Sequence, residues 1–349
     1  SSPAWAMAAF PSPPDRLANQ AVALIEPVLA RAPDNTAAIH YYIHATEVAD
    51  HPQSALPYAE KLALLAPNAS HLIHMAAHTY FHVGRYEDAA TINAAAMGTD
   101  SDHLAQTKTR GGLTSAFYYQ HNLSFGMAGT LMSGDHALAL KFADHLHRAF
   151  AEKNFAKDGM SDDEGRRFII YARYEPRRLL ALPEPDEGPD TSSFHHYARG
   201  EAFAALGDAK SLAGEVDKII GDGRTMKIAR GVLKGRLAML QHRYADAAQA
   251  FEQAAVEQDG YSPHSWDPPD WWYPVRRSAA AAWLADGQPA KAAEAVQKTL
   301  AAWPYDPLAL LVLSRAENAL GHREEARRTR GQAIGLWMGD IATLNAAAI

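Results

Sequence analysis

The sequence contains no cysteine among its 349 residues. This absence excludes disulfide bonds, thiolate-bound metals, iron–sulfur clusters and cysteine nucleophiles, although it says nothing about the compartment. The sequence also has no run of about 18 apolar residues, the length a helix needs to cross a membrane. We therefore expect no membrane-spanning helix.

Positive charge is scarce as well. The chain carries 33 Lys and Arg residues against 40 Asp and Glu residues, for a formal net charge of −7. A general nucleic-acid-binding protein should present a basic face, so we expect no nucleic-acid partner. Phosphate-binding glycine loops, G-x-S-x-G elbows and H-E-x-x-H motifs are also missing, which removes support for nucleotide-dependent enzymes and common hydrolases.

The clearest positive signal is an internal period of 34 residues, the distance from Pro33 to Pro67. Each unit contains two helix-length segments joined by a short turn, such as residues 83–86. Small residues recur in the second segment, for example Ala55 and Ala59, and then Ala89 and Ala96. A proline follows the second segment and cannot extend its helix; the examples are Pro33, Pro67 and Pro304.

These features resemble the tetratricopeptide repeat. The unit from Ser70 matches it with Ala77, Tyr80, Gly84 and Tyr86, and units starting at Ile228, Tyr273 and Pro307 match it as well. Weaker units start near Gln120, Asp158 and Ser193. The resemblance implies an all-α fold, a right-handed α-solenoid of about eight helical hairpins, some irregular.

Three stretches interrupt the period. Residues 98–119 hold about 16 extra positions, including a Gly111-Gly112 break. Residues 182–190 are rich in proline, glycine and acids, and predict a loop. We place a soft boundary there, between N-terminal repeats in residues 1–181 and C-terminal repeats in residues 191–349. The third interruption is a Trp/Pro-rich loop inserted at residues 261–272. Despite these interruptions, we expect the two sets of repeats to form one continuous solenoid.

Histidine is unusually abundant in this sequence. Of the 17 histidines, 12 lie between His40 and His147. His40 and His44 form an H-x-x-x-H pair on one helical face, and His74 and His78 form a second pair, 34 residues later. In tetratricopeptide folds these positions line the concave surface. Because neighbouring helices pack about 8–10 Å apart, the four imidazoles should share one space.

Imidazole is the commonest metal ligand, so the pattern predicts a transition-metal site. We expect its ligands to be His40, His44, His71, His74, His78 and His121. Copper is favoured by the usual affinity order, with zinc or iron as alternatives. Six histidines suffice for one metal or for two. Two coppers would imply oxidation chemistry, and a single metal with an open position would suit hydrolysis. Glu47 is the expected ligand, general base or orienting residue.

A closer resemblance covers the same residues. His40-Tyr41-Tyr42-Ile43-His44 and His71-Leu72-Ile73-His74-Met75-Ala76-Ala77-His78 are similar to the H-Y-x-I-H and H-x-x-H-M-P-S-H-I motifs of a group of bacterial tetratricopeptide-repeat proteins. This chain has Ala76-Ala77 where Pro-Ser is usual. Many members of the group carry an export signal, so the resemblance slightly favours an extracytoplasmic location. The chain begins at Ser1 rather than Met, which is consistent with processing or truncation.

Further residues are expected to contact a substrate or line the groove: Tyr41, Met75, His82, Tyr118, His196 and Arg277. For His196 a core role is an equal alternative. Arg276 and Arg277 suit a carboxylate, although a structural salt bridge from Arg277 to Asp267 or Asp270 is the stronger expectation.

The sequence leaves several functions open. The first is a metal-dependent redox enzyme that acts on a small molecule or peptide in the groove. The second is a non-catalytic scaffold that binds a protein or peptide partner, with the histidines as hydrogen-bonding residues. The third is metal storage or delivery. A purely structural role also remains, because duplication of a repeat would copy a packing histidine.

Overall fold

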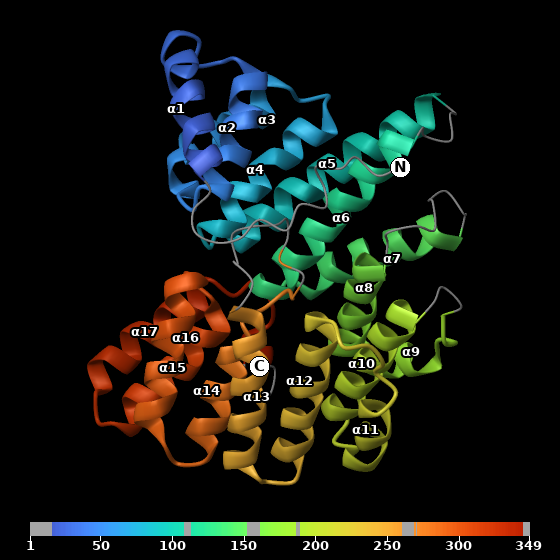
Figure 1. Ribbon diagram of the computed structural model, residues 1–349, viewed down its shortest axis with the longest axis vertical. Helices are drawn as coiled ribbons and strands as arrows, with labels where there is room; N and C mark the ends of the chain where they lie inside the picture. The colour runs from blue at the N-terminus through green and yellow to red at the C-terminus, as the bar shows by residue number, and fades with distance from the viewer. Residues whose placement is uncertain are drawn as a thin grey trace.

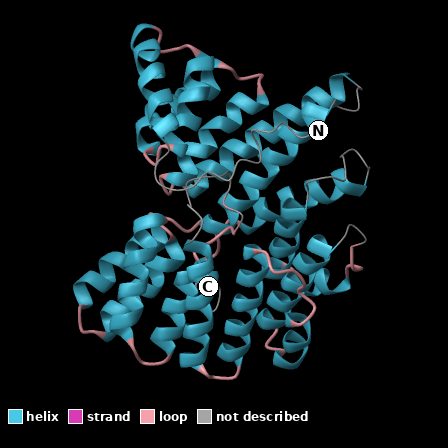
Figure 2. Ribbon diagram, viewed as in Figure 1, coloured by secondary structure: helices cyan, strands magenta, loops and turns pink. Residues whose placement is uncertain are grey.

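The structure is a computed structural model that describes residues 16–107, 113–151, 161–185, 189–259, 269 and 271–344. Every regular element within these ranges is a helix, and none of them is a strand (Figure 2). The all-α prediction is confirmed. No helix of the described part combines the length and apolar character needed to cross a membrane.

Eight helical pairs follow a single helix, α1 (Arg16–Arg31), and stack into a solenoid (Figure 1). The pairs are α2 (Thr36–Val48) and α3 (Leu56–Leu65), α4 (Ser70–His82) and α5 (Tyr86–Thr107), α6 (Leu113–Ser133) and α7 (His136–Ala151), α8 (Ser161–Tyr174) and α9 (Pro176–Ala181), α10 (Pro189–Ala205) and α11 (Ala209–Val216), α12 (Arg224–Leu240) and α13 (Tyr244–Asp259), α14 (Val275–Ala285) and α15 (Pro289–Ala302), and α16 (Pro307–Ala319) and α17 (Arg323–Gly335).

Local chemistry sets the ends of these helices. α1, α3 and α15 each end two residues before the predicted prolines Pro33, Pro67 and Pro304. At the other end, the side chain of Asn35 accepts a hydrogen bond from the Ala38 amide and caps α2. Asp306 caps α16 in the same way.

Small residues allow the helices to approach one another closely. Ala55, Ala59, Ala89 and Ala96 have no exposed surface and lie where the pattern expected close packing. A larger side chain at these positions would push neighbouring helices apart, because protein cores have little spare volume.

The predicted interruption at residues 98–119 is built into two long helices. Within the described residues, the additional chain lengthens α5 to 22 residues and α6 to 21, so most of the insertion is helical. The Gly111-Gly112 break itself lies outside the described residues. α5 and α6 pack against each other.

The loop near residues 182–190 separates α9 from α10, although residues 186–188 lie outside the described ranges. α10 packs on both α8 and α9, so helix stacking runs across this loop. We propose on this basis that residues 1–181 and 191–349 belong to one continuous solenoid. Most of the expected Trp/Pro-rich loop at 261–272 lies outside the described residues.

The last repeats return to the first ones, which a simple linear array would not do. The Tyr86 hydroxyl donates a hydrogen bond of 3.1 Å to the Pro304 carbonyl, and the rings of Phe81 and Trp303 lie 6.0 Å apart. A second contact joins the C-terminal segment to α6, where the Met338 amide donates to the Ser133 carbonyl at 2.9 Å. In Figure 1, the orange and red helices accordingly lie beside the blue-green repeats.

We predict that this closure depends on Gly84. Its φ is +80°, and a Cβ at this position would overlap the Pro304 backbone. Gly287 has a similar φ of +74° but open space around it. Both Gly84→Ala and Gly287→Ala should lose about 1 kcal/mol from backbone strain, and Gly84→Ala should lose more because of the overlap. Urea unfolding of both variants measures the difference, and equal losses would contradict a role for the closure.

Candidate metal centre

Helices α2, α4 and α6 bring the predicted histidines together. His40 and His44 lie on α2, His71, His74 and His78 on α4, and His121 on α6. Their rings form one contiguous group: successive ring centroids lie 4.8 Å apart for His44 and His78, and 4.6 Å for His74 and His121. The four-residue spacing places each pair on one helical face, and packing of α2 on α4 makes the faces meet. All six predicted ligands are thus neighbours.

The hydrogen bonds of His74 and His78 define which ring nitrogen carries the proton. His74 Nδ1 lies 2.7 Å from Asn93 Oδ1, and the Asn93 amide nitrogen donates to the Ala89 carbonyl, so the oxygen must face His74. His78 Nδ1 lies 3.0 Å from Glu47 Oε2. Each Nδ1–H therefore donates to an oxygen, and each Nε2 directs its lone pair elsewhere.

The two lone pairs point at each other. The Nε2 atoms of His74 and His78 are 3.0 Å apart, a distance at which two unprotonated nitrogens repel. Either a proton or a cation must lie between them. Two imidazole nitrogens bound to one tetrahedral metal at 2.0–2.1 Å would lie about 3.3 Å apart, so the observed separation is close to that of a metal-ligating pair.

His121 completes a three-histidine group. One nitrogen of each of His74, His78 and His121 lies within 4.8 Å of the others, and His74 and His78 are fully buried. A second group with the same spacing consists of His44, Glu47 and His78. His78 belongs to both groups and is their common member.

Glu47 is buried, with 3% of its surface exposed, and accepts hydrogen bonds through both oxygens. Oε1 lies 2.6 Å from His82 Nε2, and Oε2 lies 3.0 Å from His78 Nδ1 and 3.5 Å from His44 Nδ1. A buried carboxylate is costly without such donors. These contacts hold the imidazole of His78 in one orientation and tautomer, as carboxylates do beside metal-bound histidines.

His40 and His71 form another close pair, with Nε2 atoms 3.2 Å apart. Burial, followed by the charge of His44, lowers the pKa of His40 to about 4, and burial together with neighbouring histidines lowers that of His71 to about 3. Burial also holds the pKa of His74 well below its ordinary value. These three imidazoles are neutral at pH 7, the form that binds metals.

The cluster reaches solvent on the α2 side. His40 and His44 are partly exposed, whereas His74 and His78 have no exposed surface. Tyr41 is 62% exposed and its ring stacks on His40 at 5.1 Å. The ring of Tyr118 lies 4.1 Å from that of His71. Tyr41 and Tyr118 therefore lie directly against two histidines of the cluster.

Two of the expected groove residues lie elsewhere. Met75 is fully buried in the hydrophobic core, because α4 is covered by α2, α3, α5 and α6 and only its N-terminal part reaches the surface. His82 is also buried and bonds to Glu47, so it belongs to the carboxylate's hydrogen-bond network.

The structure places the two remaining candidates outside the histidine cluster. Both ring nitrogens of His196 meet carboxylates, Glu215 at 2.7 Å and Glu184 at 3.2 Å, which is a packing role on α10. Arg277 forms its ion pair with Asp306 at 2.9 Å. The sequence predicted Asp267 or Asp270 as its partner, and both residues lie outside the described ranges. The observed partner, Asp306, is distant in the sequence.

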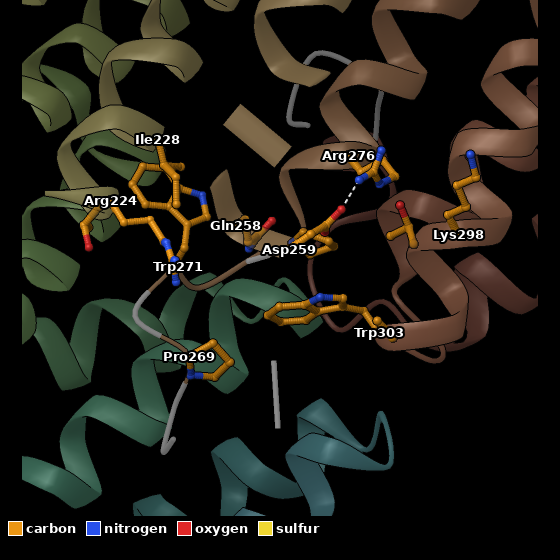
Figure 3. A pocket seen from close by; sticks show the side chains of 13 residues that line it. Arg224, Ile228, Gln258, Asp259, Pro269, Trp271, Arg276, Lys298 and Trp303 are labelled. Atoms are coloured by element: carbon orange, nitrogen blue, oxygen red, sulfur yellow. Dashed lines mark hydrogen bonds and ion pairs between the residues drawn. The ribbon is translucent and has the colours of Figure 1, made fainter. Parts of the chain in front are cut away.

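Arg276 lines a cavity of about 90 Å³ bordered by α12, α13, α14 and α15, and Trp271 and Trp303 also line it (Figure 3). The guanidinium of Arg276 is paired with Asp259, as the dashed line in Figure 3 marks. Arg276 is therefore already paired with a carboxylate of the protein, and the expectation that it binds a carboxylate ligand stays a prediction.

Two contributors to the cluster were missed in the sequence. Asn93 on α5 orients His74. In the sequence it is a single amide side chain among the alanines of its helix, and a polar residue buried at such a position needs a hydrogen-bond partner. Phe125 on α6 packs on His74, His78 and His121, with ring centroids 4.6 to 5.3 Å away. No motif distinguishes this phenylalanine from an ordinary core residue.

We predict that the metal-free protein loses stability as the pH falls from about 6.5 to about 4. An unfolded histidine titrates near 6.5, whereas the pKa values of His40, His71 and His74 are depressed in the folded chain. Over this window the unfolded state binds more protons, so the stabilisation is complete above pH 6.5 and is lost on acidification. Urea midpoints at several pH values in EDTA measure it. His71→Gln should flatten the slope and His136→Gln, an exposed control, should not; identical slopes would contradict this account.

No family model matches the chain, and no curated protein matches its sequence. Solved structures do match it. The tetratricopeptide-repeat domain of P58(IPK) is 14% identical, with 94% of this chain and 90% of that one covered and a TM-score of 0.29. The human IFIT1 dimer with m7Gppp-AAAA is 14% identical over 91% and 68% of the two chains, with a TM-score of 0.39. From its own helical pairs, the chain has the fold of a tetratricopeptide-like α-solenoid.

Proposed function

We propose that the chain binds a transition metal through His74, His78 and His121. The observation that carries the proposal is the pair of Nε2 atoms 3.0 Å apart, whose Nδ1 atoms are both held by protein oxygens. A metal placed between the two nitrogens would accept both lone pairs and remove their repulsion.

Copper is the ion we favour. The candidate ligands are imidazoles alone, and among divalent first-row metals the affinity of such a site is greatest for copper(II). The three histidines leave coordination positions for a further ligand, and His44 lies on the side from which a small molecule would enter. A copper ion at this place suits oxidation of a small molecule or peptide, and a zinc ion would suit activation of water.

We assign Glu47 an orienting role in this proposal. Both of its oxygens already accept hydrogen bonds from histidines, which favours a positioning function over that of general base. The similarity to the bacterial tetratricopeptide-repeat group supports the same residues, because the H-Y-x-I-H and H-x-x-H-M-x-x-H motifs contain most of the cluster. The alternatives are a peptide-binding scaffold and metal storage or delivery.

We predict that His78→Gln abolishes stoichiometric metal binding. The wild-type chain should retain about one equivalent of copper(II) after dialysis, measured by elemental analysis of untagged protein. The matched control is His196→Gln, which also removes a buried histidine bonded to a carboxylate. It should leave the metal content unchanged. Metal that is sub-stoichiometric, or retained by His78→Gln, would contradict the proposed centre and leave the scaffold function.

We further predict that Glu47→Gln weakens copper binding about 10- to 100-fold without abolishing it, because the amide can still accept a hydrogen bond from His78 but lacks the charge. Competition with a chelator of known affinity gives the ratio. The control is Glu215→Gln, which alters the carboxylate beside His196 and should not change copper affinity. Complete loss of binding would instead make Glu47 a direct ligand, and an unchanged affinity would remove it from the site.

A further inference from the structure

A larger cavity, of about 400 Å³, lies between α8 and the C-terminal repeats, and no member of the histidine cluster lines it. The first helices of four consecutive pairs, α8, α10, α12 and α14, supply most of its wall. α13 and the segment before α14 supply the rest. Its volume is sufficient for a small-molecule ligand.

Three guanidinium groups line this cavity, from Arg173, Arg236 and Arg277. Arg236 is paired with Glu201 at 3.1 Å, and Arg277 with Asp306 at 2.9 Å. Arg173 has no carboxylate within ion-pair distance among the described residues. Its guanidinium instead lies over the ring of Tyr174, 5.7 Å from the centroid. Among the described residues, the cavity wall therefore has one positive charge in excess.

Two buried donors at the wall have no hydrogen-bond partner among the described residues. They are Nη2 of Arg173 and Nε of Arg277. Arg277 is only 1% exposed, so water cannot easily serve its Nε. Buried polar groups of folded proteins are almost always paired, and a cluster of unpaired donors marks a place where an acceptor belongs.

An unpaired guanidinium in such surroundings is costly. Burial lowers the pKa of Arg173, which shows that its environment disfavours the charge. An anion bound beside it would offset this cost and satisfy the unpaired donors. Because the wall carries a single excess charge, a monoanion balances it better than a phosphate dianion, and the planar fork of arginine matches a carboxylate.

The rest of the wall is apolar and aromatic. Ile169, Leu240 and Phe251 face the cavity, and Trp272 and Tyr197 add aromatic surface. We propose that this cavity binds a small organic acid, with its carboxylate held by Arg173 and Arg277 and its apolar part packed against these side chains. The inference is independent of the proposed metal centre.

Isothermal titration of the full chain in EDTA tests the proposal. The probes are 3-phenylpropanoate and indole-3-acetate, with 3-phenylpropanamide as the neutral analogue. Both acids should bind saturably with at least about millimolar affinity, and the amide should not. Arg173→Gln should weaken binding tenfold or more, about 1.4 kcal/mol, and Arg173→Lys should weaken it less. Arg177→Gln removes the same charge from an exposed position on α9 and should leave affinity unchanged.

A second measurement does not depend on the choice of probe. If the half-buried guanidinium of Arg173 is unpaired in the ligand-free protein, Arg173→Gln should raise the melting temperature of that protein, whereas Arg177→Gln should not. Absence of saturable binding by both acids, or equal affinity of wild type and Arg173→Gln, would overturn the proposal. Tighter binding by the peptide Ala-Ala-Phe than by either acid, lost on C-terminal amidation, would also overturn the small-molecule assignment and indicate a peptide terminus.

Discussion

The buried carboxylate of Glu47 is the constraint on which the histidine cluster depends. A carboxylate with 3% exposure needs hydrogen-bond donors, and the donors come from His78 and His82 on the neighbouring helix. These contacts set how α2 and α4 lie against each other. They also choose the tautomer of His78, and so direct its Nε2 toward His74. One buried charge thereby fixes helix register, ring orientation and the direction of a lone pair.

Closure of the solenoid gives this arrangement a rigid support. α4 lies between its own neighbours, and near its C-terminal end Phe81 and the Gly84 turn meet Trp303 and Pro304 from the seventh helical pair. A linear array of repeats would leave that end of α4 open to solvent. With both sides covered, α4 has little freedom to shift, and the histidines that it carries can keep their geometry.

The two halves carry different chemistry on comparable helices. In the N-terminal half the first helices present histidines, which burial keeps neutral. In the C-terminal half the first helices present arginines, which stay charged and need counter-ions. Arg277 joins these regions, because it pairs with Asp306 at the start of α16 and its Nη1 lies 3.7 Å from the sulfur of Met132 on α6.

The sequence by itself determined the helical period, the residues at which α1, α3 and α15 end, and the histidine pairs that share a face. These features are local, since they follow from proline geometry and from the 3.6-residue turn. Tertiary structure alone decided that Met75 is core, that His82 bonds to Glu47 and that Arg277 pairs with Asp306. It also recruited Asn93 and Phe125 to the cluster and brought Pro304 against Gly84. Each of these depends on which helices meet in space, and a repeat pattern does not reveal how far the solenoid curves before its ends touch.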